Sequence, residues 1–95
     1  MANLMGILGD SDMAVLLELL VEAAKVRQKP EYKGIWYPEN REHPELWKAI
    51  QDMKETCRIL RSEHGVKNSD LYDIFYGKPL EKAYLLLKRM EKDER

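Results

Sequence analysis

The sequence is poor in residues that cross-link chains or hold metals, because its 95 residues include one cysteine and two histidines. A single cysteine excludes an intramolecular disulfide and a zinc site with several thiolate ligands, and it fits a reducing compartment. Five glycines and four prolines leave long stretches without a helix breaker. We therefore expect one small helical domain, 1–95, with flexible ends at 1–9 and 91–95.

The chain also lacks a strong excess of one charge and a long hydrophobic run. Its 16 Lys and Arg against 17 Asp and Glu give a net charge of −1, which argues against a general polyanion binder. The apolar stretch 13–26 is interrupted by Glu18 and Glu22 and is shorter than the roughly 20 residues that span a bilayer. No base precedes Asp10, unlike the start of a secretory signal. We expect a cytoplasmic protein that does not associate with membranes.

A first helix is predicted from Asp12 to about Gln28, after the capping residues Asp10 and Ser11. Its polar positions form one narrow stripe: Glu18, Glu22, Lys25 and Lys29. Nearly all its other positions are apolar, so more than one side needs a cover. We expect a symmetric dimer to supply part of that cover through Leu16, Leu19 and Leu20. The alternative cover is the loop that follows the helix.

A second helix is predicted from Pro44, which suits a first turn, to His64, before the stop signal Gly65. Its apolar residues follow a heptad spacing: Leu46, Ile50, Met53, Cys57 and Leu60. Two heptads are too few for an independent coiled coil, so the spacing is interpreted as an ordinary core stripe of a helical bundle.

Two shorter helices are predicted further along the chain. The first is capped by Asn68 or Ser69 and ends at Gly77, and the second begins at Pro79. The predicted apolar face of the last helix comprises Leu80, Ala83, Tyr84, Leu87 and Met90. The predicted fold is all-α, a small four-helix domain of orthogonal or bundle-like packing with the first helix at its centre.

The connection 30–43 is long for a compact domain and is rich in aromatic residues. Gly34 and Pro38 oppose helix formation there. The segment is interpreted as a lid over the end of the bundle, with Trp36 in the core and Tyr32 or Tyr37 exposed to a partner. The alternative is stacking of these rings on a base or a proline.

The stretch 60–78 carries the pattern of two helices joined by a tight turn. Gly65 lies at the turn, Val66 is a small apolar residue after it, and Leu71 and Ile74 are suited to dock the second helix. On these residues the stretch resembles the helix-turn-helix of small bacterial and phage regulators. The resemblance implies DNA contacts by Lys67, Asn68, Ser69, Tyr72 and Lys78.

Several residues of this stretch depart from that pattern. Arg61 stands where a small residue lets the two helices approach closely, and His64 takes a place that is usually apolar. Asp70 and Asp73 put negative charge on the second helix, which repels phosphates. The alternative interpretation is a structural turn without a role in DNA binding.

A basic stripe lies beside the apolar seam of the second helix. Its members are Trp47, Gln51, Lys54, Arg58 and Arg61, spaced by four and three residues. Such a stripe suits an anionic partner, while the plainer alternative is a solvated face balanced by nearby acids.

The sequence offers no convincing catalytic arrangement. Cys57 lies on the apolar seam, where a thiol is an inert hydrophobe, and His64 is about two turns away. His43 and His64 are roughly 30 Å apart by helical rise, so they do not share a metal. Asp70 and Asp73 lack a second acidic pair well placed to complete a magnesium site. We expect no enzymatic activity, no metal and no cofactor.

The expected function is that of a small helical protein-interaction or regulatory module, acting as a homodimer with a surface for a protein partner. The predicted partner-binding residues are Tyr32, Tyr37, Trp47, Lys54, Arg58 and Arg61. The alternative is a helix-turn-helix DNA-binding regulator that uses residues 60–78, although nucleic acid is the less favoured partner.

Overall fold

The structure is a computed structural model that describes Leu8 and residues 11–93. The helices in this part are α1 (Asp12–Arg27), α2 (Pro44–His64), α3 (Asn68–Tyr76) and α4 (Pro79–Asp93), with a 3-10 turn η1 (Pro30–Tyr32) after α1. No strand occurs among the described residues, so the predicted all-α class is confirmed. The segments expected to be flexible lie mostly outside this part, although Leu8 is buried in the core and α4 continues to Asp93.

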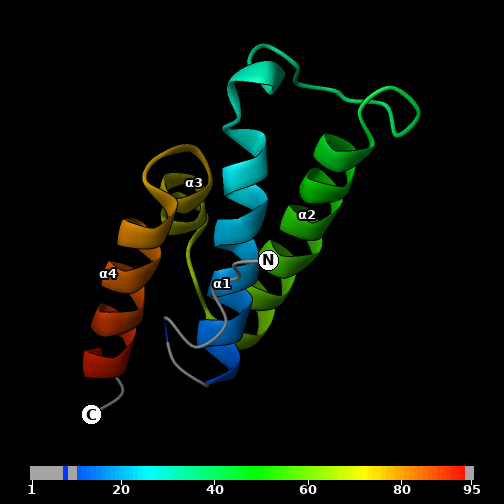
Figure 1. The fold of residues 1–95 in the computed structure, drawn as a ribbon. Coiled ribbons are helices and arrows are strands. Elements are labelled where there is room, and N and C mark those ends of the chain that lie inside the picture. The colour runs from blue at the N-terminus through cyan, green and yellow to red at the C-terminus, as the bar shows by residue number, and fades with distance from the viewer. Residues whose placement is uncertain (1–7, 9–10, 94–95) are drawn as a thin grey trace.

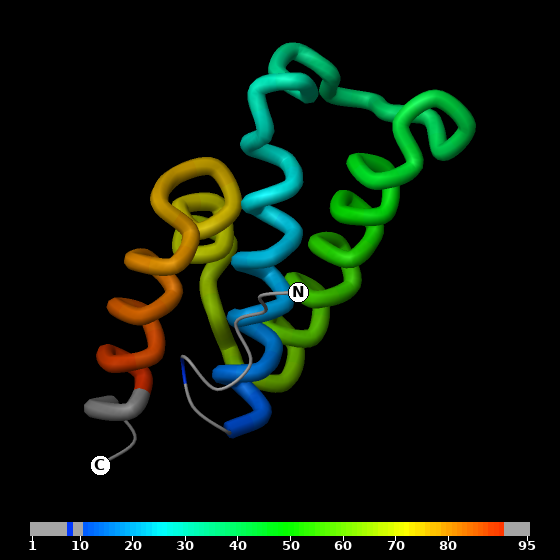
Figure 2. The backbone as a smooth tube through the Cα atoms, viewed as in Figure 1, coloured from blue at the N-terminus to red at the C-terminus, as the bar shows by residue number. Residues whose placement is uncertain are grey.

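Helix α1 is the centre of the fold, as predicted. It packs against α2, α3 and α4, and α3 also packs against α4 (Figure 1). The backbone trace shows α2 and α4 running antiparallel to α1 on opposite sides of it, with α3 near the upper end of α4 (Figure 2). The molecule measures 47 × 27 × 19 Å, so it is thin in one direction. A thin arrangement leaves part of the central helix at the surface.

The helix ends follow the local chemistry of the chain. The Ser11 Oγ accepts a hydrogen bond from the Ala14 N–H at 3.1 Å, which confirms Ser11 as the cap of α1. Gly65 closes α2 in the left-handed conformation at φ 64°, and the Val66 N–H donates to the Leu60 carbonyl at 3.1 Å. The predicted cap of α3, Asn68 or Ser69, was wrong by one or two residues, because the short connection brings Lys67 to the capping position.

The buried face of α2 only partly follows the predicted heptad seam. Leu46, Cys57 and Leu60 are buried, whereas Ile50 and Met53 are half-buried. Because α2 packs chiefly against α1, its buried face is shifted toward another pair of small residues on that side. These residues are Ala49 and Thr56.

Two predicted helix faces need correction. On α4, Tyr84 is exposed and Leu86 is buried in its place, because the face that meets α1 and α3 is rotated from the predicted one. On α1, Glu18 is buried although it belongs to the predicted polar stripe, whereas Lys25 is exposed. A central helix with neighbours on both sides keeps only part of its polar stripe in solvent.

The connection 30–43 does not form the predicted lid. It begins with the turn η1 and then extends outward between the upper ends of α1 and α2 (Figure 1). Trp36 is 60% exposed, so its predicted place in the core was wrong. The physical reason is that the Trp36 ring stacks on the Arg27 guanidinium, 4.6 Å from the ring centroid, at the edge of the bundle.

Candidate functional site

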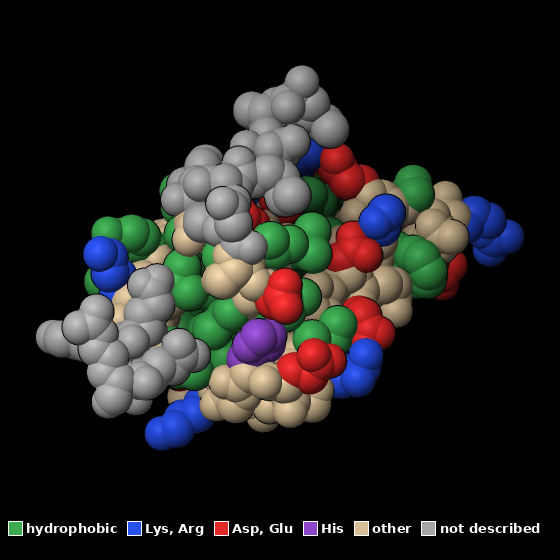
Figure 3. All heavy atoms as spheres, turned by 90° about the horizontal axis from the view of Figure 1, so that it is seen from below, with side chains coloured by type: hydrophobic (Ala, Val, Ile, Leu, Met, Phe, Trp, Pro, Cys, Tyr) green, Lys and Arg blue, Asp and Glu red, His purple; other side chains and the backbone are tan. Residues whose placement is uncertain are grey.

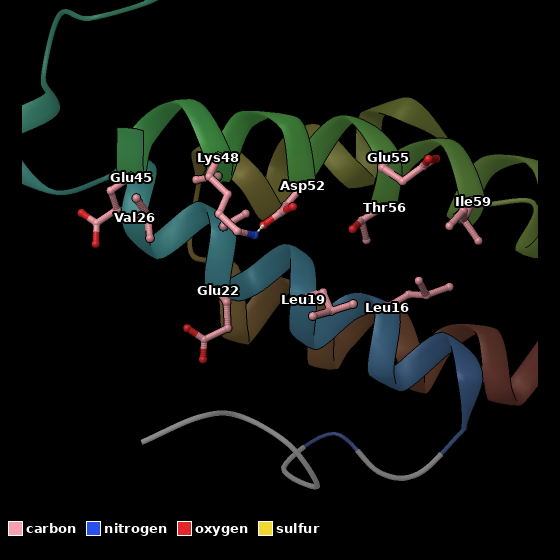
Figure 4. A pocket seen from close by; sticks show the side chains of 12 residues that line it. Leu16, Leu19, Glu22, Val26, Glu45, Lys48, Asp52, Glu55, Thr56 and Ile59 are labelled. Carbon is pink, nitrogen blue, oxygen red and sulfur yellow. Dashed lines mark hydrogen bonds and ion pairs between the residues drawn. The ribbon is translucent and has the colours of Figure 1, made fainter. Parts of the chain in front are cut away.

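An open groove of about 500 Å³ runs between α1 and α2. We call it the acidic groove. Its apolar and small side chains are Leu16, Leu19, Ala23, Val26, Ala49, Thr56 and Ile59. In the close view, Leu16 and Leu19 from α1 lie opposite Thr56 and Ile59 from α2 (Figure 4). The groove therefore has an apolar floor made by two antiparallel helices.

The border of this groove carries an excess of negative charge. Its ionisable residues are Glu22, Glu45, Lys48, Asp52 and Glu55. The Lys48 Nζ donates to the Asp52 Oδ2 at 2.8 Å, and Arg58 donates to the Glu55 Oε1 at 2.6 Å. Four carboxylates and one ammonium group line the groove, and Lys29 and Arg58 at its edge pair with Glu45 and Glu55, so a small excess of negative charge remains that favours a cationic ligand.

Glu45 fastens the loop to the upper end of this groove. Its Oε1 accepts hydrogen bonds from the Lys29 Nζ and from the Tyr32 hydroxyl, both at 2.9 Å. These bonds lower the pKa of the Glu45 carboxyl and raise the pKa values of Lys29 and Tyr32. Tyr32, expected to bind a partner, is thus half-buried and engaged within the protein.

The three residues predicted to form a dimer interface differ in burial. Leu20 is fully buried in the core of the single chain, so the prediction was wrong for this residue. Leu16 is half-buried and Leu19 is 48% exposed, and both line the acidic groove. Ala23 and Val26 share this face but were not predicted to lie there, although the spacing of 16, 19, 23 and 26 is a heptad pattern that marks one face.

A second open groove, of about 410 Å³, lies on the other side of α2, next to α3. We call it the basic groove. It is lined by Met53, Lys54, Cys57, Arg61, Asn68, Leu71, Tyr72, Phe75 and Tyr76. Its only charged lining residues among those described are Lys54 and Arg61. The two grooves beside α2 are therefore opposite in charge.

The residues of the predicted basic stripe differ in exposure and in their contacts. Lys54, Arg58 and Arg61 are all exposed, and Trp47 is half-buried. Arg61 donates to the Asn68 side-chain oxygen at 3.1 Å across the turn. Tyr37, the other predicted partner contact, is 95% exposed on the loop.

The residues suggested by the helix-turn-helix resemblance are exposed, but the helices do not pack in the expected way. Lys67, Asn68, Ser69, Tyr72 and Lys78 all reach solvent. Helix α2 packs chiefly against α1, while α3 packs against α1 and α4, and the basic groove opens between α2 and α3. Arg61 lines this gap. The motif has a small residue at this position so that the two helices can approach closely, and the large Arg61 side chain is consistent with their separation here.

The charges on α3 are partly compensated. The Asp70 Oδ2 accepts a hydrogen bond from the Arg89 Nη2 of α4 at 2.8 Å. Cys57 is buried at the floor of the basic groove, and burial raises the pKa of its thiol. A thiol of raised pKa carries little thiolate at neutral pH, which fits a packing role.

Seen from below, hydrophobic side chains lie at the surface next to acidic ones (Figure 3). No group of three or more potential metal ligands occurs within the described part of the chain. Of the helices formed by the described residues, none combines the length and hydrophobicity that a bilayer crossing requires.

Comparisons with protein-family models, curated proteins and solved structures gave no match to this chain.

Proposed function

We propose that the protein is a protein-interaction module whose acidic groove binds an amphipathic helical segment of another protein. The observation that carries this proposal is the open apolar floor between α1 and α2, bordered by four carboxylates and one lysine. The occupant it fits has an apolar face flanked by Lys and Arg.

The floor has the geometry that a third helix requires. Leu16, Leu19 and Val26 lie at heptad positions along α1, with Leu16 near Ile59 of α2 at one end of the groove and Val26 near Glu45 at the other (Figure 4). A helix with apolar residues at positions i, i+3 and i+7 places them in such a groove, as amphipathic helices do in other recognition grooves. Burial of an exposed leucine contributes roughly 1.5–3 kcal/mol when it is complete, so a few such contacts support binding.

A second copy of this chain is a poorer occupant than a basic helix. A symmetric dimer places the same surface on both sides of the interface. Two acidic grooves facing each other bring Glu22, Asp52 and Glu55 toward their own copies, and like charges disfavour such pairing. Duplex DNA is also less well supported, because α3 does not pack on α2 as a recognition helix does on its partner.

The test uses a designed helical peptide with leucines in a heptad pattern and lysines on their flanks. Binding of the labelled peptide is measured by fluorescence anisotropy for the wild type and for the Leu19→Lys variant. We expect saturable binding that weakens at high salt, and at least tenfold weaker binding by Leu19→Lys. A peptide with glutamates in place of the lysines is expected to bind at least tenfold more weakly than the lysine peptide.

The matched control is Leu85→Lys, because Leu85 is a 53% exposed leucine on the outer side of α4. It is expected to bind the lysine peptide as the wild type does. Equal binding of both peptides, or equal binding by Leu19→Lys and Leu85→Lys, contradicts the proposal. Sedimentation equilibrium is expected to give a single species of 11.2 kDa, and a dimer that Leu19→Lys dissociates favours a second copy as the occupant instead.

A further inference from the structure

Three exposed aromatic rings form a row that extends from the loop onto α3. The Trp36 and Tyr76 ring centroids are 6.3 Å apart, and those of Tyr76 and Tyr72 are 4.5 Å apart. Trp36, Tyr76 and Tyr72 are 60%, 43% and 65% exposed. We call these three residues the aromatic row. Exposed rings in contact with one another form a continuous surface on which flat groups can stack.

Basic side chains lie at both ends of the aromatic row. At the Trp36 end, a cavity of about 510 Å³ is lined by the bases Arg27, Lys29 and Lys33. At the Tyr72 end, the basic groove is lined by Lys54 and Arg61. Tyr76 lines both cavities, so they adjoin at this ring, and we call the two cavities together with the aromatic row the path. None of the described residues lining either cavity is acidic.

The bundle holds the aromatic row in place before any ligand binds. Arg27 is buried, donates through Nη1 to the Tyr32 carbonyl at 3.1 Å, and supports the Trp36 ring at 4.6 Å. The Gln28 Nε2 donates to the carbonyls of Phe75 and Gly77, at 3.0 and 3.1 Å, at the end of α3. A preorganised row loses little entropy when it binds.

We propose that this path binds single-stranded nucleic acid. Unpaired bases stack on Trp36, Tyr76 and Tyr72, while phosphates meet Lys33 at one end and Arg61 at the other. Stacking on aromatic rings next to a positively charged groove is the common physical basis of single-strand binding. A duplex is excluded as the ligand because its bases are already stacked on each other and hidden from the rings.

The observations favour this ligand over an acidic peptide. An acidic segment is recognised by basic side chains alone, whereas nucleic-acid bases also need exposed rings in series, and the aromatic row offers three such rings, tilted by 40° and 38° to one another. Exposed acids also lie near the path: Asp73 on α3, Glu31 on η1, Glu39 in the loop, and Glu45, which pairs with Lys29. None of them lines the two cavities. The net charge of −1 does not oppose the proposal, because the path itself is lined by bases.

The principal test compares Trp36→Ala with Tyr37→Ala. Tyr37 is the next residue and is 95% exposed, yet it belongs to neither cavity lining described above, so it is a matched control. Binding of fluorescein-labelled dT10 and U10 is measured by anisotropy at 50 mM salt. We expect 5- to 100-fold weaker binding by Trp36→Ala, wild-type binding by Tyr37→Ala, and partial rescue by Trp36→Phe. Stronger binding of U10 than of dT10 identifies RNA as the preferred source of the single strand.

A second test addresses the phosphate contacts. Arg61→Gln is expected to weaken binding and to lower the slope of log affinity against log salt by about 0.7. Arg58→Gln is its control, because Arg58 is an exposed arginine of the same helix that pairs with Glu55 and does not line the basic groove. The helical signal in the circular dichroism spectrum of each variant shows whether a loss of oligonucleotide binding results from unfolding.

Several results overturn the proposal. They are the absence of binding at 50 mM salt, equal affinities of folded Trp36→Ala and Tyr37→Ala, and displacement of the oligonucleotide by duplex DNA at equal concentration. Displacement by a Glu-rich peptide at equal concentration indicates an acidic protein segment as the occupant and also overturns it. The Leu19→Lys variant is expected to bind oligonucleotides as the wild type does. The experiments therefore test single-strand binding by the path independently of peptide binding by the acidic groove.

Discussion

The two sides of α2 differ in both charge and construction. On the α1 side, the acidic groove carries Glu45, Asp52 and Glu55, whereas on the α3 side the basic groove carries Lys54 and Arg61. The chain as a whole has a net charge of −1. In a small helical protein, a near-neutral total can therefore conceal two surfaces that select opposite partners.

The two surfaces also depend on different parts of the chain. The acidic groove is formed by regular faces of two long helices, α1 and α2. The basic groove uses the opposite face of α2 together with the short helix α3, and the aromatic row joins α3 to the loop 30–43. Substitutions that disturb one surface should thus leave the other intact, and the following predictions test this separation.

The largest effect is expected from the core that both surfaces share. Leu60 is fully buried, so Leu60→Ala should lower the free energy of unfolding by about 2–5 kcal/mol. The adjacent Ile59 is half-buried in the open acidic groove, so Ile59→Ala should cost only about 1 kcal/mol. Urea unfolding followed by circular dichroism measures both. A loss of 2 kcal/mol or more for Ile59→Ala means that the acidic groove is already covered in the isolated protein.

The next effect concerns the turn that places α3 beside α2. Gly65 has φ 64°, and an added Cβ meets no atom within 4 Å, so Gly65→Ala costs only backbone strain. We expect a loss of about 1–2 kcal/mol, and a smaller loss for Gly65→Asn, because asparagine tolerates the left-handed conformation. Thermal unfolding of the two variants provides the comparison. Equal losses contradict backbone strain as the cause.

A smaller effect is expected where α1 holds the end of α3. Gln28→Ala removes two hydrogen bonds to backbone carbonyls and should cost about 1 kcal/mol. The control is Lys25→Ala, at an exposed position of the same helix, which should change stability by less than about 0.5 kcal/mol. Peptide binding at the acidic groove should be unchanged in both variants. A loss of peptide binding in Gln28→Ala contradicts the separation of the two surfaces.

The smallest effect concerns Glu45, which is exposed and whose pKa is lowered by the hydrogen bonds from Lys29 and Tyr32. A lowered pKa means that the carboxylate stabilises the fold above its ordinary value of 4.5 and that this contribution disappears as the pH falls below it. Glu45→Gln should therefore lower the melting temperature slightly at pH 6.5 and by a smaller amount at pH 3. A difference that grows toward low pH contradicts this assignment.

Much of the fold was predictable because its signals are local. Ser11 caps α1, and Pro44 and Gly65 set the bounds of α2, each through the conformation of its own backbone or one nearby hydrogen bond. The central position of α1 was predictable from its narrow polar stripe.

The surfaces were less predictable because they depend on which neighbour covers each helix face. The spacing of Leu16 and Leu19 marks an apolar face. It does not predict that these two residues line a groove while Leu20 is buried in the core. The aromatic content of the loop was visible in the sequence, whereas the exposure of Trp36 follows from its contact with Arg27 at the end of another element.

The sequence by itself determined the all-α class, the bounds of the long helices and the exposure of Lys54, Arg58 and Arg61, because capping and helical periodicity act over a few residues. Only the tertiary structure decided that Glu18 is buried and that Trp36, Tyr76 and Tyr72 form a row. These features require segments that lie far apart in the chain to meet, and such contacts depend on how the helices pack rather than on local conformational preference.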